Sequence, residues 1–314
     1  MTTVFAHNPV MLTECIDGLQ VKDGGIYYDG TIGGAGHSYE ILERSGPSGR
    51  LVATDLDEEA IKASRKRLER FQGRFEIYKS NYKNYDEVFR EAGVDKVDGV
   101  LLDFGVSSHQ LDKEMRGFSY MKPYAPLDMR MDTKAYLSAE IVLNYYPQEK
   151  LYRIIRDYGE EKFAAKITEN IVKARSKRHL STCGELVEII EKSIPKKFQL
   201  GAPCARKTFQ AIRIEVNGEL DGLYDCVVGL SRRLKKGGRI AILTFHSLED
   251  RIVKNAFRDL EQECICDKSI PVCICGKVKE LEVITKKPIV PSDEEMEENS
   301  RSRCAKLRIA ERII

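Results

Sequence analysis

The sequence predicts an α/β protein in which a parallel-rich, doubly wound sheet is interrupted by an all-helical insertion. Strand and helix patterns alternate through the first hundred residues, as they do in βαβ units. From residue 111 to about residue 200, helix signals follow one another without a convincing strand, and the sheet pattern then resumes. We therefore expect a sheet domain formed by 1–110 and 205–314, with 111–204 as a helical insertion.

The individual elements follow from hydrophobic periodicity and from capping residues. In the sheet domain, apolar runs bounded by turn signals predict strands at 26–28, 51–57, 75–78, 97–103, 239–245, 281–285 and 305–310. In the same domain, amphipathic patterns predict helices at 57–71, 85–92, 208–235 and 248–260. In the insertion, Ser138 and Thr182 are expected N-caps, Pro147 opens a helix, and 160–175 is a longer amphipathic helix. The acidic stretch 292–300 is expected to be flexible.

Composition indicates a soluble globular protein, because 42% of the 314 residues are hydrophobic and 32% are charged. The net charge is only +2, so the field of the whole molecule gives no argument for a nucleic-acid partner. Basic residues cluster at 173–178, 232–236 and 301–308, where a solvated face is the usual explanation and a polyanion partner is the alternative. The sequence shows neither a signal-peptide pattern nor an apolar run long enough to span a membrane, so we expect a cytoplasmic protein without a membrane partner.

The glycine-rich turn at residues 30–36 is the centre of the predicted site. It joins a short buried strand to a helix that starts near Ser38, and its glycines allow positive φ angles and the close approach of a ligand. Free N–H groups at the start of that helix, and the helix dipole, face whatever lies over the turn. About twenty residues later the second predicted strand, 51–57, carries Asp55 near its end, where a carboxylate can accept both hydroxyl groups of a ribose. The turn and the acid together favour a nucleoside cofactor over an ordinary βα turn followed by a surface aspartate.

The residues of the turn discriminate between nucleoside cofactors. A nicotinamide dinucleotide fingerprint needs glycines at its first, third and sixth positions, whereas here Gly34 and Gly36 fill two of them and Tyr39 occupies the sixth. A pyrophosphate group is therefore disfavoured. S-adenosylmethionine carries no phosphate and needs an open turn with an acid for its ribose, so Asp29 and Asp55 make it the predicted cofactor.

Four polar or aromatic residues fall at or just past the ends of predicted strands: Asp29, Asp55, Tyr82 and Asp103. Because the carboxyl ends of parallel strands meet at one edge of a sheet, we expect these residues to converge there. Three of them also have a purely structural explanation. Asp55 could cap the helix after Asp57, Tyr82 could pack in the core, and Asp103 could be a capped strand end.

Cys264, Cys266, Cys273 and Cys275 form two C-x-C pairs separated by six residues. In a cytoplasmic protein, cysteines are mostly thiols or metal ligands, and four thiolates within twelve residues are enough for a tetrahedral zinc site. Zinc-binding pairs usually have two residues between the cysteines rather than one. The competing interpretation, which this spacing favours, is a thiol-rich loop or a redox-labile disulfide.

A set of longer motifs follows in order from about residue 5 to the C-terminus. The motifs are His7-Asn8-Pro9-Val10, Asp29-Gly30-Thr31 with Gly36-His37-Ser38, Asp103-Phe104-Gly105-Val106-Ser107-Ser108, Arg116-Gly117-Phe118-Ser119, Pro126-Leu127-Asp128-Met129-Arg130-Met131-Asp132, Tyr158-Gly159-Glu160-Glu161, Thr208-Phe209-Gln210-Ala211 and Phe245-His246-Ser247-Leu248-Glu249-Asp250-Arg251. They resemble the RsmH/MraW family of bacterial methyltransferases, which modify the amino nitrogen of a cytidine in 16S ribosomal RNA. The sequence departs from the family pattern at Phe104, where Leu is usual, and at Gly34-Ala35, where an Arg-Gly pair or similar is usual.

The resemblance implies a Rossmann-like, S-adenosylmethionine-dependent methyltransferase whose helical insertion takes part in RNA recognition. It implies that the cofactor is bound by Ala35, Gly36, His37, Asp55, Tyr82, Asp103 and Gln110. Within this set, Asp55 would hold the ribose hydroxyls, Tyr82 would flank the adenine, and His37 would contribute its backbone N–H. Asp103 would lie beside the cofactor and the incoming base and is the predicted catalytic residue. The implied substrate is N-4 of a specific cytidine in the 16S ribosomal RNA of the small ribosomal subunit.

Two other functions compete with this one. A methyltransferase that acts on a small molecule or lipid is disfavoured by the long helical insertion with its basic clusters. A non-catalytic RNA-binding protein would need neither an intact cofactor turn nor Asp55. The candidates for phosphate contact are the helix at 160–175, the cluster at 173–178 and Arg206-Lys207. His246, expected at the same sheet edge, either faces the RNA or is a satisfied structural histidine.

Overall fold

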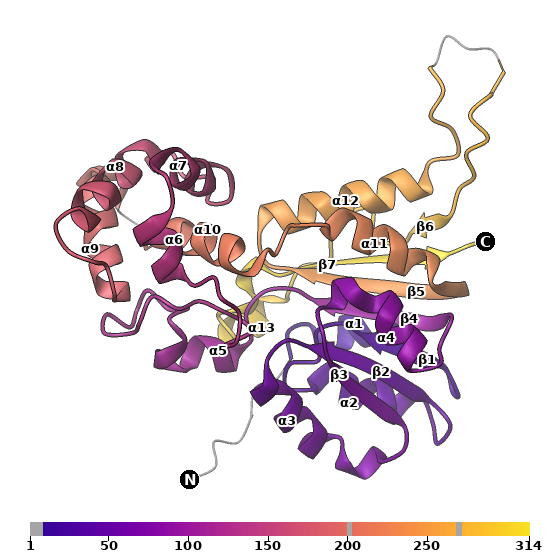
Figure 1. The fold of residues 1–314 in the computed structure, drawn as a ribbon. Helices are drawn as coiled ribbons and strands as arrows, with labels where there is room; N and C mark the ends of the chain where they lie inside the picture. The colour runs from indigo at the N-terminus through magenta and orange to yellow at the C-terminus, as the bar shows by residue number, and fades with distance from the viewer. Residues whose placement is uncertain (1–8, 200–202, 268–271) are drawn as a thin grey trace. The chain divides into compact units, whose positions relative to one another are not determined.

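The computed structural model describes residues 9–199, 203–267 and 272–314 (Figure 1). His7 and Asn8 of the first motif lie outside the described residues. The chain divides into two compact units. The sheet unit combines the first 105 residues with Gly222–Ile314, and the helical unit is Val106–Asp221. The helical unit therefore begins earlier and ends later than the insertion expected at 111–204.

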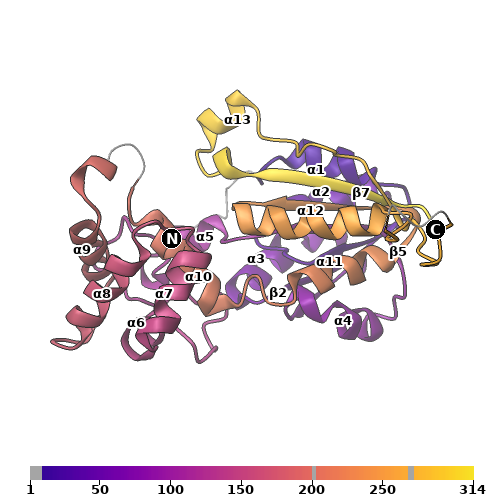
Figure 2. The same ribbon diagram turned by 90° about the horizontal axis from the view of Figure 1, so that it is seen from above.

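The sheet unit is built on seven strands in the order β3-β2-β1-β4-β5-β7-β6 (Figures 1 and 2). The strands are β1 Ile26–Asp29, β2 Arg50–Asp55, β3 Phe75–Lys79, β4 Val97–Asp103, β5 Leu234–Thr244, β6 Leu281–Val283 and β7 Lys306–Arg312. The strands from β3 to β5 run parallel, and β7 pairs antiparallel with both β5 and β6. This topology confirms the predicted parallel-rich, doubly wound sheet. The strand order reverses between β1 and β4, and ligands bind at such reversals, outside the carboxyl ends of the strands.

Helices cover both faces of this sheet. They are α1 Leu12–Leu19, α2 Gly36–Arg44, α3 Glu58–Arg67, α4 Tyr85–Glu91, α11 Leu223–Arg232, α12 Ser247–Glu261 and α13 Asp293–Glu298. Side chains of α1, α2 and α3 join the core on one face, where Leu51, Leu101 and Ile309 are buried. Over the other face lie α11 and α12, which pack on β5 and on each other (Figure 2).

A helix predicted at 208–235 is broken into two helices. The first is α10 Arg206–Asn217, which belongs to the helical unit, and the second is α11. Between them Gly218 and Gly222 take left-handed conformations, with φ of 56° and 64°, which a continuous helix cannot contain. β5 then starts at Leu234, five residues before the strand start expected at 239.

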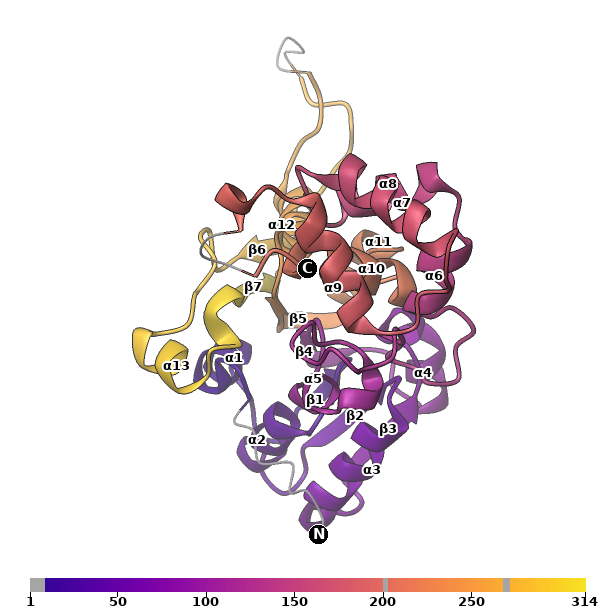
Figure 3. The ribbon, with the colours of Figure 1, turned by 90° about the vertical axis from the view of Figure 1, so that its left-hand side faces the viewer.

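The acidic stretch 292–300 is not simply flexible, because it contains α13. The Ser292 hydroxyl oxygen caps this helix by accepting the N–H of Glu295 at 3.1 Å. The Glu295 carboxylate in turn accepts the backbone N–H of Met11 at 2.7 Å, and Figure 3 shows α13 beside α1. The expectation of flexibility was wrong because an acidic composition gives no sign of this contact with a residue far away in the chain.

The helical unit consists of short helices around one apolar core. In addition to α10 they are α5 Ser108–Asp112, α6 Ala139–Tyr145, α7 Gln148–Asp157, α8 Ala164–Arg175 and α9 Cys183–Ser193. The predicted N-caps are confirmed, since hydroxyl oxygens of Ser138 and Thr182 accept N–H groups in the first turns of α6 and α9. Within the described part of this unit no residue belongs to a strand of the sheet, as predicted. Over the described part of the whole chain, no helix combines the length and apolar character needed to cross a membrane.

Two motifs of the insertion have a structural role in the helical unit. The Arg116 side chain is buried and donates to the carbonyl oxygens of Arg130 and Met131 at 3.0 and 2.9 Å. Gly117 has a φ of 67°, and a Cβ there would lie 2.1 Å from the carbonyl oxygen of Pro126. The stretches 116–119 and 126–132 therefore need an arginine and a glycine to pack against each other.

Candidate cofactor site

Asp29 holds the glycine-rich turn in shape. It is the last residue of β1 and is only 2% exposed. Its Oδ1 accepts the N–H of Thr31 at 3.0 Å, and its Oδ2 accepts the hydroxyl of Ser38 at 2.6 Å. Burial raises the pKa of this carboxyl to about 6. Thr31 lies in the glycine-rich turn and Ser38 lies at the start of α2. Asp29 therefore connects the two ends of the glycine-rich turn.

The start of α2 presents unused backbone donors. Ala35 precedes this helix with a φ of 56°, and no side chain caps it. Among the residues that the structure describes, no acceptor lies opposite the N–H groups of Gly36, His37 or Ser38. These donors lie at the positive end of the helix dipole. Gly36 is required here because a Cβ would lie 2.6 Å from Cγ of Pro9, so Pro9 packs directly on the turn.

Asp55 ends β2 with its carboxylate against the same turn. Its Oδ2 accepts the N–H of Gly33 at 2.9 Å, and its Oδ1 accepts the N–H of Asp57 at 2.8 Å. The residue is half-buried, and each oxygen retains a lone pair for a hydroxyl donor. The alternative role as a helix cap belongs to Asp57 instead, whose Oδ1 accepts the N–H of Glu59 at the start of α3 at 3.0 Å.

Asp103 ends β4 next to the side chain of His37. Its backbone N–H donates to Oγ1 of Thr31 at 2.6 Å, which joins β4 to the turn. His37 Nε2 lies 3.0 Å from the carbonyl oxygen of Val10, and since a carbonyl only accepts, Nε2 carries the proton. Burial lowers the pKa of His37 to about 4, so its ring is neutral near pH ~7. The unprotonated Nδ1 therefore faces Asp103, 3.9 Å from its Oδ2.

The carboxyl groups at this edge lie close enough together to disfavour one another's ionisation. Burial, followed by the charges of Asp29 and Glu249, raises the pKa of Asp103 to about 8. Burial likewise raises the pKa of Asp55 above its usual range. Glu249 is a buried residue in the first turn of α12, and its approach to Asp103 depends on how β5 pairs with β4. Sequence reasoning placed Glu249 in a motif but missed this role, because no strand-end rule points to it.

The ring of Tyr82 lies beside the glycine-rich turn. It begins a short 3-10 helix, Tyr82–Asn84, after β3, and its half-buried ring lies against Phe104 with centroids 5.3 Å apart. Gly30 makes room for it, because a Cβ at residue 30 would lie 2.8 Å from Cβ of Tyr82. The ring is thus partly core, as the alternative interpretation holds, and partly available to a planar ligand.

Two further predicted residues have structural contacts. Nδ1 of His246 accepts the N–H of Glu249 at 3.4 Å, and the Glu249 carboxylate accepts the N–H of Phe245 at 3.0 Å, so the pair caps α12. This geometry supports the structural interpretation of His246. Gln110 lies in the helical unit, where its Oε1 accepts the N–H of Ser107 at 3.0 Å as part of the cap of α5. Its contact with the cofactor stays a prediction.

The chemistry of this donor set suits a cationic, phosphate-free nucleoside. A positive charge placed next to Asp55 and Asp103 would favour their ionised forms, whereas a pyrophosphate would disfavour them further. The free N–H groups of α2 can bind a carboxylate or an adenosine edge. Asp55 supplies the acceptor that a ribose requires.

The chain is similar to known proteins along nearly its whole length. The model of the MraW methylase family matches residues 4–313. "Ribosomal RNA small subunit methyltransferase H" of Clostridium botulinum (strain Kyoto / Type A2) is 52% identical over 309 residues, which cover 98% of this chain and 99% of that protein. The protein of the same name from Clostridioides difficile (strain 630) is 50% identical over 310 residues, with 98% and 99% covered. Among solved structures, a putative rRNA-methylase from Clostridium thermocellum covers 98% of this chain and 100% of its own, with a TM-score of 0.43 and 13% identity.

Proposed function

The chain belongs to the MraW methylase family, and we propose that it transfers a methyl group from S-adenosylmethionine to N-4 of a cytidine in 16S ribosomal RNA. The family that the motifs predicted is thereby confirmed. Two relatives of near-identical length carry the name ribosomal RNA small subunit methyltransferase H, which supports small-subunit RNA as the substrate. S-adenosylmethionine is the methyl donor, in keeping with the carboxyl-rich edge of the sheet.

The placement of Asp103 beside neutral His37 is the observation that carries the proposal. An exocyclic amine offers hydrogens, so the residue nearest the chemistry must accept a hydrogen bond and afterwards a proton. Asp103 is the acceptor that β4 delivers to the cofactor turn, and its ionised form, which predominates above its pKa of about 8 and which a nearby positive charge favours, can take up a proton. Methylation of a ring carbon or of a ribose oxygen would not need a residue at position 103 that accepts a hydrogen bond from an amine.

The lone pair of the cytosine amine is delocalised into the ring, so the nitrogen is a weak nucleophile. S-adenosylmethionine, when bound, supplies a methyl group on a positively charged sulfur. Ionised Asp103 accepts one amine hydrogen, which returns electron density to the nitrogen and aligns it for attack. Transfer of the methyl group would leave a positive charge on the nitrogen, and one proton of the nitrogen would then pass to Asp103. The free Nδ1 of His37, 3.9 Å away, is a second proton acceptor on the same side.

The basic side chains of the helical unit differ in how far they are available to RNA. Lys173, Lys177 and Arg206 are exposed, and within the described residues they take part in no ion pair. Arg175 is used inside the unit, where its guanidinium donates to two carbonyl oxygens at 2.7 Å, and Arg178 pairs with a glutamate. We therefore assign phosphate contact to the first three, as a salt-dependent contribution to RNA binding.

The basic clusters of the sheet unit are largely neutralised by neighbouring acids. In the cluster at 232–236, Arg233 pairs with two aspartates and Lys235 with a third. In the cluster at 301–308, Arg308 is buried and pairs with Asp250 at 2.6 Å. Both clusters therefore fit the solvated or structural interpretation better than the interpretation as an RNA-binding surface.

A methyl-transfer assay tests the proposal. Purified protein and labelled cofactor are incubated with small subunits, or their RNA, from a strain that lacks the gene, and the RNA is digested to nucleosides. We expect label in N-4-methylated cytidine, and free cytidine should be a very poor substrate because phosphate contacts position the base. Label at a ring carbon or at a ribose oxygen would overturn the assignment, and label in a small molecule or lipid alone would favour the competing function.

A variant series tests the residue assignment. Asp103→Asn should lower turnover by roughly 10²–10⁴-fold, the usual contribution of a positioned acid or base, with little change in the affinity for S-adenosylhomocysteine. Asp95→Asn is the matched control, because Asp95 is an exposed acid whose ion pair is with Arg233, on the protein surface. If Asp103→Asn kept full turnover in a folded protein, Asp103 would be excluded as the proton acceptor.

A further inference from the structure

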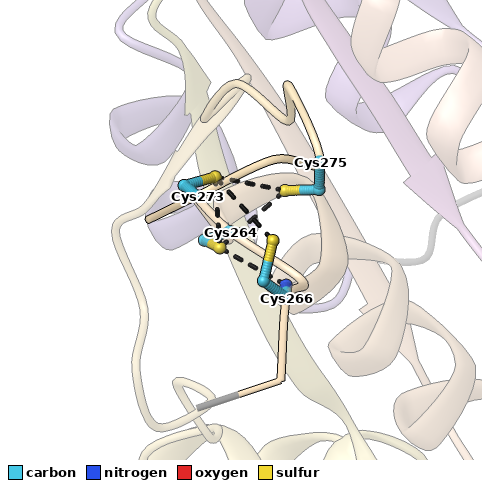
Figure 4. Close-up of side chains that lie close together, drawn as sticks. All are labelled: Cys264, Cys266, Cys273 and Cys275. Carbon is cyan, nitrogen blue, oxygen red and sulfur yellow. Dashed lines mark hydrogen bonds between the residues drawn. The ribbon is translucent and has the colours of Figure 1, made fainter. Parts of the chain in front are cut away.

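The segment between α12 and β6 brings four cysteines together (Figure 4). The sulfur atoms of Cys264, Cys266, Cys273 and Cys275 all lie within 4.8 Å of one another. All four are free cysteines, so no disulfide accounts for their convergence. The base of the segment is closed by a hydrogen bond of 2.8 Å from the N–H of Glu280 to the carbonyl oxygen of Leu260.

The distances between the sulfur atoms match a tetrahedral metal site. Zinc binds thiolate sulfur at about 2.3 Å, so two sulfurs on one tetrahedral ion lie about 3.8 Å apart. Here Cys273 Sγ lies 3.4 Å from Cys264 Sγ, 3.5 Å from Cys275 Sγ and 4.0 Å from Cys266 Sγ. The distance between Cys264 Sγ and Cys275 Sγ is 3.8 Å.

Backbone hydrogen bonds link the two C-x-C pairs reciprocally. The N–H of Ile265, inside the first pair, donates to Cys275 Sγ at 3.5 Å. The N–H of Ile274, inside the second pair, donates to Cys266 Sγ at 3.4 Å. Such donors favour sulfur in its thiolate form, which is the form that binds a metal. One residue between the cysteines of a pair is enough for both sulfur atoms to reach one ion, because side chains two residues apart in an extended chain point to the same side.

The apolar side chains that the structure describes in this segment do not hold it in place. The side chains of Ile265, Val272, Ile274 and Val278 are 65%, 70%, 78% and 62% exposed, so they form no core. Chains of this size that lack a core are ordered by disulfides or by metals. In place of apolar side chains, the four cysteine sulfur atoms converge inside the segment.

We propose that Cys264, Cys266, Cys273 and Cys275 bind one zinc ion as thiolates, in a closed and therefore structural site. Four protein ligands fill the tetrahedral coordination of zinc and leave no position for a substrate. The site lies past the end of α12, whose fifteen residues span about 22 Å from the cap at His246. Each thiol gives up its proton to solvent as zinc binds.

Metal analysis of the full-length protein, purified without oxygen or chelator, tests the proposal directly. We expect one equivalent of zinc per chain, released in proportion when a mercurial titrates the thiols. Replacement by cobalt should give thiolate charge-transfer bands in the near ultraviolet and the visible bands of a tetrahedral ion. Fully reduced protein that takes up neither zinc nor cobalt would overturn the proposal. A mass lower by two hydrogens for each bonded pair would show disulfides in place of a metal.

Variants distinguish this site from adventitious binding to thiols. Cys264→Ser and Cys273→Ser should each lose most of the zinc, and trypsin should cleave after Lys277 at least about tenfold faster, because the open form is then more populated. Cys304→Ser is the matched control, since Cys304 is an exposed cysteine outside the cluster, and it should keep one equivalent. Affinity for S-adenosylmethionine should stay unchanged in all three variants, so the outcome is independent of the proposed function. Equimolar zinc in Cys264→Ser and Cys273→Ser would refute the assignment of these ligands.

Discussion

Replacing Asp55 by alanine should weaken cofactor binding by an amount that the structure allows us to estimate. The Asp55 carboxylate already accepts the N–H groups of Gly33 and Asp57, and its remaining lone pairs face the sheet edge. A hydrogen bond to a charged acceptor contributes roughly 1.5–3 kcal/mol. Loss of the ribose contact should therefore raise the Kd for S-adenosylmethionine about 10- to 150-fold.

The assay is isothermal titration calorimetry with two ligands. The ribose is common to S-adenosylmethionine and S-adenosylhomocysteine, so Asp55→Ala should weaken both by the same factor. Asp103→Asn should weaken S-adenosylmethionine more than S-adenosylhomocysteine, because only the former carries the positive sulfur. The difference between the two variants separates ribose binding from charge recognition.

Asp57→Asn is the control for Asp55→Ala. Asparagine caps helices about as well as aspartate, so this variant removes a nearby charge while the cap of α3 remains. Its affinity should stay close to that of the unmodified protein. An unchanged Kd in an Asp55→Ala protein that unfolds cooperatively at the normal temperature would remove Asp55 from the site.

Three further outcomes are expected. The pKa of Asp103 is raised to about 8 in the folded protein, and that of Asp29 to about 6. The contribution of each group to stability is therefore fully present below its pKa in the unfolded chain. It is lost as the pH rises through its pKa in the folded protein. Urea unfolding of the ligand-free protein between pH ~6 and ~8 should show this decline, which Asp103→Asn should reduce; a flat profile would contradict the shifts. Gly117→Ala should destabilise the helical unit by about 2–4 kcal/mol, from left-handed strain and a clash with Pro126, and a smaller loss in thermal unfolding would argue against the structural role of this motif. Lys173→Ala should lower RNA affinity and reduce the salt slope by about one unit without changing cofactor affinity, and an unchanged slope would exclude this phosphate contact.

Local rules were sufficient to predict where the glycine-rich turn, Asp55 and Asp103 lie in the sheet unit. The turn, Asp55 and Asp103 follow from strand ends and glycine chemistry, which act over a few residues. Gly218 and Gly222 also indicated a break in the helix predicted at 208–235. The prediction of one continuous helix relied on amphipathic periodicity instead. Periodicity shows which face of a segment is apolar. Two consecutive helices can show the same pattern as one long helix, so periodicity does not reveal the break between them.

Contacts between distant segments could not be predicted in this way. The neutral tautomer of His37 depends on the carbonyl oxygen of Val10, and the pKa of Asp103 depends on Glu249 in α12. Similarly, α13 is held to α1 by the contact between Glu295 and Met11. Each of these properties arises from a residue whose position is set by the tertiary fold.

The position of β7 in the sheet has a consequence for the order in which the protein can be assembled during translation. Residues 106–221 form a continuous unit, so they can fold as soon as they leave the ribosome. The sheet unit must wait, because β5 lies between β4 and β7, and β7 is synthesised after every other strand. Until then the apolar edge of β5 is unpaired, and such edges are templates for aggregation. In the interval between synthesis of β5 and of β7, we therefore expect this edge of the nascent chain to be open to aggregation.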